Sequence, residues 1–169
     1  MIDYHIGVEH FLKQLPKGVF ITVKGQDTTN TMTIAWGHIG IIWGKPVFIA
    51  YVRYSRYTYD VLRTANDFTI NVPNIGDLKE ALSIAGTQSG RNIDKFKEAK
   101  LTLQPSKVVE TPSIQECPLN YECEILYTQT QEPGLIPKEI EERYYPNHDT
   151  HIMFFGEIKH VDYNEKRDA

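Results

Sequence analysis

The sequence predicts a mainly β protein with short decorating helices, in which the strands form a closed β-barrel. About six or seven β-branched and aromatic segments of strand length recur between glycine- and proline-containing turns. Helical periodicity is confined to short stretches, and its alternation with the strands is too irregular for a doubly wound parallel sheet. With 169 residues, 41% of them hydrophobic, the chain has material for one core, so we expect residues 1–169 to form a single domain.

Charge and composition exclude several classes of protein. A formal net charge of −4 argues against a broad nucleic-acid surface, which needs a basic excess. No stretch approaches the ~20 apolar residues of a membrane helix, and the first residues lack the pattern of a signal peptide. Cys117 and Cys123 make no disulfide framework. We expect a cytoplasmic protein, without membrane or nucleic-acid partners, whose two thiols are packed in the fold.

In the first half of the chain, apolar spacing predicts a helix over residues 5–15, ended by Pro16 and Gly18. Strands are predicted at Val19–Lys24, at 31–42 and at 47–53, the last of them apolar enough to be buried on both faces. Ser55 is expected to cap a helix that follows it, because Ser is a favoured N-cap and apolar residues at helical spacing come next.

The second half follows the same reasoning. A strand at Asp67–Val72 precedes a helix at 78–85, for which Asp77 is the expected cap, and a short helix at 93–98 capped by Asn92 or Asp94. Strands are predicted near 113–117 and at 119–128. The proline-rich segment 129–150 is the least regular and holds a short helix at Lys138–Tyr144. A strand at 151–161 closes the fold.

The strongest chemical signal follows the buried strand 47–53. Arg53, Ser55, Arg56, Tyr57 and Thr58 come within six residues, where a helix is expected to begin. Arginine offers a charged fork that matches phosphate oxygens, and the first turn of a helix presents free N–H groups. Locally, an anion site and a plain cap with solvated arginines are equally compatible with this pattern.

Two further segments could line a ligand site. In the first, hydroxylated and small residues alternate with apolar ones along a strand: Thr31, Met32, Thr33, Ile34 and Ala35. A flat heterocycle could lie against such a strand, and the same pattern is typical of an ordinary amphipathic strand. The second is a polar loop that offers positive charge beside a glycine, which permits a positive φ and a close ligand approach. The same loop could equally be a plain connection between helices. Its residues are Ser89, Gly90, Arg91 and Lys95.

Several familiar motifs are absent from the sequence. There is no GxGxxG fingerprint, no GxxxxGK[ST] loop and no GxSxG elbow. His148 and His151 resemble half of a metal site, but no second pair of ligands matches them, so we expect no metal. Among the scattered histidines, His38 is favoured as a site residue because it lies beside a glycine-rich bend.

Taken in order, six motifs resemble the flavin reductase-like family, close to its flavoredoxin branch. They are Asn30-Thr-Met-Thr-Ile-Ala-Trp-Gly37, Trp43-Gly-Lys-Pro46, Val52-Arg-Tyr-Ser-Arg-Tyr-Thr-Tyr59, Phe68-Thr-Ile-Asn-Val72, Ser89-Gly-Arg-Asn-Ile-Asp-Lys-Phe96 and Phe155-Gly-Glu-Ile158. Each is weak alone, whereas their order over residues 18–161 is specific. One departure is Ala85, where similar proteins often carry Cys; the segment is interpreted as helix packing.

The resemblance implies a split β-barrel that binds FMN and works as a homodimer, with the flavin near the subunit interface. It implies that residues 31–35 lie along the isoalloxazine and that Arg53, Ser55, Arg56, Tyr57 and Thr58 serve the ribityl phosphate. Ser89, Gly90, Arg91 and Lys95 would close over the cofactor. A histidine matching His151 is common before the last strand of similar proteins, without a role that the sequence assigns.

The function implied is that of an FMN-dependent oxidoreductase of the flavin reductase type. Reduced nicotinamide, as NADH or NADPH, or a redox protein would supply electrons, and no catalytic residue beyond the flavin is expected. Main-chain or Thr33 donors would tune the flavin. Two alternatives stay open: an FMN-binding electron carrier or sensor that does not turn over NAD(P)H, and a barrel that binds a different ligand.

Overall fold

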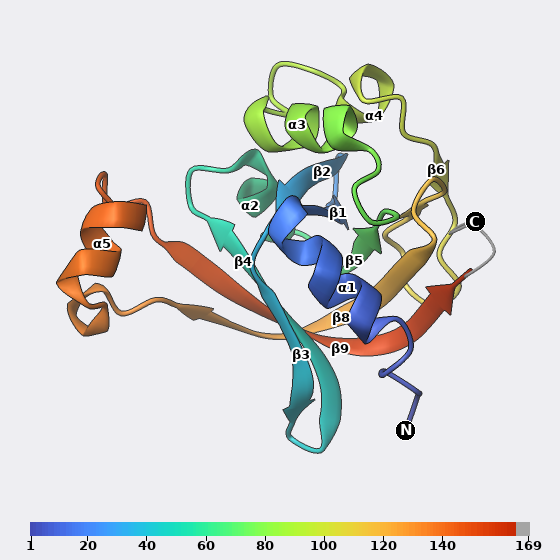
Figure 1. Cartoon of the computed structure of the whole chain (residues 1–169), viewed down its shortest axis with the longest axis horizontal. Coiled ribbons are helices and arrows are strands. Elements are labelled where there is room, and N and C mark those ends of the chain that lie inside the picture. Colours follow the sequence, from blue (N-terminus) through green and yellow to red (C-terminus); the bar gives the residue numbers. More distant parts are fainter. Residues whose placement is uncertain (165–169) are drawn as a thin grey trace.

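The computed structural model describes residues 1–164, and its centre is a strongly curved sheet of seven antiparallel strands (Figure 1). The order across the sheet is β2-β1-β5-β8-β9-β4-β3. The strands are β1 (Val19–Lys24), β2 (Thr29–Ile34), β3 (Gly37–Ile42), β4 (Lys45–Arg53), β5 (Asp67–Val72), β8 (Leu119–Thr130) and β9 (His151–Tyr163). Within the described residues β2 and β3 are edge strands that do not pair with each other. The barrel is therefore split, and the closed barrel predicted from the strand pattern is wrong.

Short helices cover one end and the open side of the sheet. α2 (Tyr57–Leu62), α3 (Lys79–Thr87) and α4 (Lys95–Glu98) gather at one end, whereas α1 (Val8–Gln14), continued by η1 (Leu15–Lys17), crosses the body (Figure 1). β6 (Leu103–Gln104) and β7 (Ser113–Ile114) form a small second sheet. The amphipathic spacing of α1 places Phe11 in the core, with its ring 5.3 Å from that of Phe48 and 6.1 Å from that of Tyr121.

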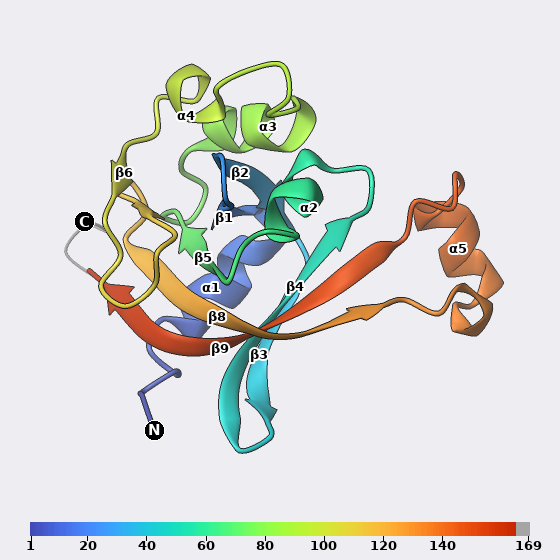
Figure 2. The same cartoon turned by 180° about the vertical axis from the view of Figure 1, so that it is seen from behind.

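Two ribbons project from this body. The outer ends of β8 and β9 run together, and the residues between them form η2 (Pro133–Leu135) and α5 (Lys138–Tyr144) at the tip (Figure 2). We call these outer ends and residues 131–150 the arm. The hairpin of β3 and β4 projects separately. Both ribbons carry large exposed apolar side chains, among them Ile41, Trp43, Tyr127, Leu135 and Ile140.

Most predicted elements are confirmed, and the strand predicted over 31–42 is wrong. It is two strands, because the chain leaves β2 at one edge of the sheet and enters β3 at the other edge. Ala35 and Trp36 make the crossing. Gly37 then lies so close to the ring of Phe48 that an added Cβ would stand 3.0 Å from its Cζ. A β-branched pattern cannot reveal such a crossing, since both strands have the same propensity. Burial of 47–53 on both faces is also wrong, since Ile49, Tyr51 and Arg53 are only half-buried.

Two predicted helix caps are wrong as well. Arg56, not Ser55, is the N-cap of α2, because the Ser55 hydroxyl donates a hydrogen bond to the Asp149 carboxylate instead. Leu78, with φ 52°, precedes α3 in place of Asp77. The cap of α4 is Asp94, which accepts hydrogen bonds from two main-chain N–H groups as expected.

Cys117 and Cys123 are buried, as the sequence predicted, and burial raises the pKa of both thiols. Over residues 1–164, no helix has the length and apolar character needed to cross a membrane.

Candidate functional site

A cavity of about 170 Å³ lies between the end of β2, the end of β4 and the start of β9. It collects six of the predicted residues: Met32, Thr33, Ile34, Ala35, Arg53 and Arg56. Trp36, Tyr51 and His151 also line it and were not among the predicted ligands. Strand register explains two of them. Tyr51 shares a face of β4 with Arg53, and Arg53 pairs directly with His151.

The side chains of β2 are largely used by the protein itself. Met32 and Ile34 pack in the core, and the buried Thr31 hydroxyl donates to the main-chain oxygen of Ile21 at 3.0 Å. The Thr33 hydroxyl donates to the Leu82 carbonyl at 2.6 Å in the ligand-free protein, and Thr33 lines the cavity. Within residues 1–164, β2 pairs only with β1, which leaves the outer main-chain groups of β2 without a strand partner and available to a ligand.

Arg56 and Lys95 bring two cations to one carbonyl. Arg56 Nη1 donates to Gly86 O at 2.8 Å and its Nη2 to Ala85 O at 3.4 Å, while Lys95 Nζ donates to the same Ala85 oxygen at 2.8 Å. These carbonyls belong to the last turn of α3, whose dipole favours positive charge. Within residues 1–164, no carboxylate forms an ion pair with either cation.

The electrostatics of this pair favour an added anion. Burial, and secondly the charge of Arg56, lower the pKa of Lys95 to about 8. Burial and the charge of Arg53 lower the pKa of Arg56, against a smaller opposing effect of Asp149. Two partly desolvated like charges held side by side form a site that a phosphate group would neutralise.

Arg53 and Ser55 are engaged with the arm. Arg53 donates to the carbonyls of Asp149 at 2.6 Å and Tyr144 at 3.0 Å, and its guanidinium lies 5.0 Å over the ring of Tyr145. Ser55 binds the Asp149 carboxylate through its main-chain N–H, at 3.1 Å, and through its hydroxyl. In this structure these two predicted phosphate ligands fasten the arm to the start of α2, while Arg53 still lines the cavity.

Three further predicted residues, Tyr57, Gly90 and Lys95, line a second cavity of about 320 Å³. Thr58 is buried and accepts a hydrogen bond from Asn30 at 2.9 Å. Gly90 does not take a positive φ, contrary to expectation. A glycine is required at this position because a larger residue would collide with its neighbours: an added Cβ would fall 2.2 Å from Asn30 Oδ1 and 2.8 Å from the Tyr57 ring.

Two residues of the polar loop are held by protein groups. Arg91 forms an ion pair with Asp60, and its guanidinium lies 5.1 Å over the ring of Tyr57. The Ser89 hydroxyl accepts a hydrogen bond from the main-chain N–H of Arg91 at 3.2 Å. Nine of the predicted residues thus line one or other of two cavities, and the Arg56–Ala85–Lys95 contact joins the two. The other five line neither cavity: Thr31, Ser55, Thr58, Ser89 and Arg91.

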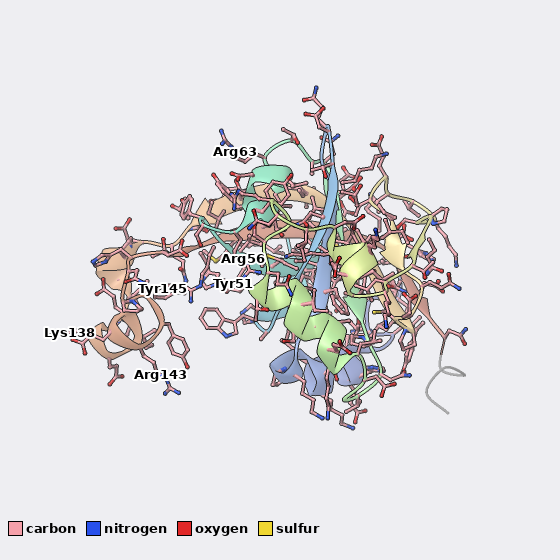
Figure 3. The ribbon with its side chains drawn as sticks, turned by 90° about the horizontal axis from the view of Figure 1, so that it is seen from above. Tyr51, Arg56, Arg63, Lys138, Arg143 and Tyr145 are labelled. Atoms are coloured by element: carbon pink, nitrogen blue, oxygen red, sulfur yellow. The ribbon has the colours of Figure 1, made fainter. Side chains whose placement is uncertain are left out.

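His151, rather than the favoured His38, is the histidine of the first cavity. His38 is exposed and lies beside a neighbouring open groove of about 610 Å³ between the body and the arm. The groove is apolar, with lining that includes Trp36, Tyr51, Leu135, Ile140 and Tyr144. Figure 3 shows Tyr51 and Arg56 on the side of the body that faces α5, with Tyr145 between them and the outer residue Lys138. No metal-binding cluster of His, Cys, Asp or Glu occurs in the described part of the chain.

Comparison with known proteins identifies the family. The model of the flavin reductase like domain matches residues 12–169. The chain belongs to the flavin reductase-like family.

An uncharacterized protein of Archaeoglobus fulgidus is 31% identical over 150 residues, which cover 89% of this chain and 74% of that protein. The flavoredoxin of Desulfovibrio vulgaris (Miyazaki F) superposes with a TM-score of 0.69 at 26% identity, over 88% of this chain and 70% of that one. An FMN-binding protein from Thermus thermophilus with bound 1-cyclohex-2-enone gives a TM-score of 0.68 at 20% identity, over 88% and 70% of the two chains. This last likeness supports the split-barrel fold alone.

Proposed function

We propose that this protein binds FMN and acts as an oxidoreductase of the flavin reductase type. The observation that carries the proposal is the meeting of Arg56 and Lys95 at the Ala85 carbonyl. Two partly desolvated cations without a carboxylate partner in the described chain suit a dianionic phosphate. Family membership and the likeness to the flavoredoxin of Desulfovibrio vulgaris support flavin as the body of the ligand.

The first cavity has the character that a flavin ring requires. The edge of β2 offers main-chain N–H and C=O groups, which suit the pyrimidine part of an isoalloxazine. The Trp36 and His151 rings, with centroids 4.7 Å apart and planes inclined at 46°, provide aromatic surface for contact with the ring. Met32 and Ile34 supply apolar contact from the core side. The residues present therefore fit FMN: Arg56 and Lys95 would hold its phosphate, and residues 32–36 its ring.

In this mechanism bound FMN supplies two-electron chemistry, while the protein positions it and sets its electrostatic surroundings. Arg56 and Lys95 fix the phosphate end and so determine how far the ring reaches into the cavity. Their positive charge also stabilises negative charge on the ligand. Trp36 and Tyr51 line both this cavity and the neighbouring apolar groove. They would shield the flavin ring from water, and the groove would give a second molecule access to the ring.

The electron donor separates two forms of the proposal. NADH or NADPH as donor makes the protein a reductase, the role that the name of its family suggests. The likeness to the flavoredoxin of Desulfovibrio vulgaris instead favours a carrier that receives electrons from a redox protein.

Purified protein decides between them. We expect it to take up FMN and become yellow, and the bound flavin to bleach under anaerobic NADH or NADPH if the protein is a reductase. A yellow protein that bleaches only with dithionite is a carrier, and a protein that takes up no FMN contradicts the flavin proposal.

We further propose that the protein works as a homodimer. The hairpin of β3 and β4 and the arm expose Trp43 at 58%, Ile41 at 51% and Leu135 at 82% of their surfaces. Large apolar side chains exposed on two projecting ribbons are typical of surfaces that bind another protein. A second copy of the chain is the partner that a symmetric, self-complementary interface would bury, and the sedimentation coefficient tests it.

A further inference from the structure

A chain of three hydrogen bonds joins the arm to the first cavity. Gln131 Nε2 donates to the hydroxyl oxygen of Tyr145 at 3.1 Å, and that oxygen lies 2.8 Å from His151 Nδ1. The main-chain N–H of His151 donates to Gln131 Oε1 at 2.8 Å, which closes the loop. Tyr145 and His151 are both buried, with 3% and 8% of their surfaces exposed.

These contacts determine where each proton lies. Because Gln131 Oε1 accepts from a main-chain N–H, the other end of that amide is the NH₂ group, which donates to Tyr145. The Tyr145 oxygen is thereby an acceptor, and His151 Nδ1 is the acceptor within reach of its own proton. The arrangement that gives each of these protons an acceptor leaves Nδ1 without hydrogen, and the neutral imidazole then holds its proton on Nε2.

Nε2 is the ring nitrogen of His151 that is available to bind a ligand. Within residues 1–164, no hydrogen-bond partner of Nε2 is present, and the ring lines the cavity together with Trp36 and Arg56. Burial, and secondly the charge of Arg53, lower the pKa of His151 to about 4, against an opposing effect of Asp149. The ring therefore stays neutral at physiological pH.

We propose that His151 is a positioning residue whose Nε2–H is a fixed, neutral hydrogen-bond donor to the ligand of this cavity. Gln131 and Tyr145 set its tautomer from the arm. The ligand group it recognises is a carbonyl oxygen or ring nitrogen of a flat heterocycle; that the heterocycle is flavin rests on the proposed function. Unlike an imidazolium, this donor adds no third positive charge beside Arg53 and Arg56.

The tautomer is measured without any ligand. In protein labelled with ¹⁵N-histidine, long-range ¹H–¹⁵N spectra between pH 5 and 8 should give His151 the pattern of the Nε2–H form, with no titration. The signal is assigned by its loss in His151→Gln. Besides Arg53 and Asp149, the titratable groups around the ring are the guanidinium of Arg56 and the hydroxyls of Tyr51 and Tyr145. An Nδ1–H pattern, or a midpoint near 6.5, overturns the proposal.

The matched variant is Tyr145→Phe, which removes one oxygen and keeps the ring under Arg53. It should release the tautomer, so that both neutral forms of His151 are populated, while burial and the charge of Arg53 still keep the ring neutral over the measured range. An unchanged His151 signal in this variant would show that Tyr145 does not set the proton, and would overturn that part of the proposal.

Ligand binding gives the second readout. His151→Phe should weaken FMN and riboflavin equally, by about 3- to 10-fold, because a neutral hydrogen bond to the ring is lost and the phosphate site is untouched. His151→Gln, which can place an N–H near the former Nε2, should stay within about 3-fold. His5→Phe, at an exposed site far along the chain, is the control.

The outcomes separate this inference from the proposed function. If the unaltered protein binds FMN and His151→Phe binds it equally well, the donor role is wrong and the proposed function stands. If the unaltered protein binds neither flavin, the proposed function fails and so does the flavin as partner of His151, while the histidine spectra still confirm or overturn the fixed tautomer.

Discussion

Replacing Lys95 by methionine should move stability and ligand binding in opposite directions. Methionine keeps most of the length and apolar volume of the side chain and removes only the charge. The structure holds this ammonium almost fully buried, with 3% of its surface exposed, against one carbonyl oxygen and near Arg56. The charge is therefore a cost to the ligand-free protein and a benefit once an anion is bound.

The magnitude follows from the pKa. A fall from 10.5 to about 8 corresponds to about 3 kcal/mol of unfavourable charge burial at neutral pH, of which relaxation of the surroundings leaves about 1–2 kcal/mol. The lost hydrogen bond to Ala85 offsets about 1 kcal/mol of that gain. Lys95→Met should thus be as stable as the unaltered protein or up to about 1 kcal/mol more stable in urea unfolding at pH 7.

FMN binding should fall steeply in the same variant. A charge-assisted hydrogen bond contributes about 1.5–3 kcal/mol, so the Kd for FMN should rise about 10- to 150-fold, whereas riboflavin, which lacks the phosphate, should change less than about 2-fold. Quenching of flavin fluorescence measures both. The control is Lys97→Met, an exposed lysine of the same helix.

The pH dependence supplies a second check. In the ligand-free protein Lys95 loses its proton above about pH 8, and a bound phosphate would hold that proton to higher pH. FMN affinity should therefore decline as the pH rises above about 8, and this decline should be missing in Lys95→Met. Equal losses for FMN and riboflavin, or a variant clearly less stable than the unaltered protein, would refute the reasoning.

The remaining predictions concern the phosphate pair, the dimer and the core. Arg56→Ala should weaken FMN by about 1–3 kcal/mol and riboflavin far less, with the exposed Arg63→Ala as control in the same titration; equal loss would place Arg56 elsewhere. Ile41→Glu should give monomers in sedimentation velocity, and an unchanged sedimentation coefficient would exclude that hairpin from the interface. Gly156→Ala should lower the free energy of unfolding by about 1–3 kcal/mol, because the new Cβ would stand 2.6 Å from Phe68 Cζ; a stable variant in urea would contradict this packing.

Acid stability tests His151 in the folded state. Its pKa is lowered to about 4, so between about pH 6.5 and 4 the unfolded chain binds a proton that the folded protein does not. The contribution of His151 to the free energy of unfolding is therefore largest above pH 6.5 and falls as the pH drops toward 4. Comparing urea midpoints at pH 7 and pH 5, the loss should be smaller in His151→Gln than in the unaltered protein; equal losses would contradict it.

Local patterns predicted the elements well, and β1, β5 and α5 have the predicted bounds. Their side chains follow strong propensity or helical spacing, which act over a few neighbours. The crossing at Ala35 and Trp36 was not predictable, because it depends on which sheet edge each strand joins. Local preference favours Ser55 as a helix cap, but its hydroxyl donates a hydrogen bond to Asp149, which lies 94 residues away in the sequence.

The candidate site shows the same division between local and distant information. The Arg56 and Lys95 segments were recognisable as cationic, but their meeting at one carbonyl depends on how α3 and α4 pack. His151 was underestimated because its neighbours on the cavity, Trp36 and Arg53, come from other strands. Knowledge of the β4–β9 register alone would have placed His151 beside Arg53.

The central claim is that the Arg56–Lys95 pair binds the phosphate of a flavin. It is tested most directly by titrating the unaltered protein with FMN and with riboflavin at pH 7 and comparing the two dissociation constants. We expect FMN to bind at least about 10-fold more tightly, the ratio that one charge-assisted phosphate contact provides. Equal affinity for the two flavins, or no binding of either, would contradict the claim.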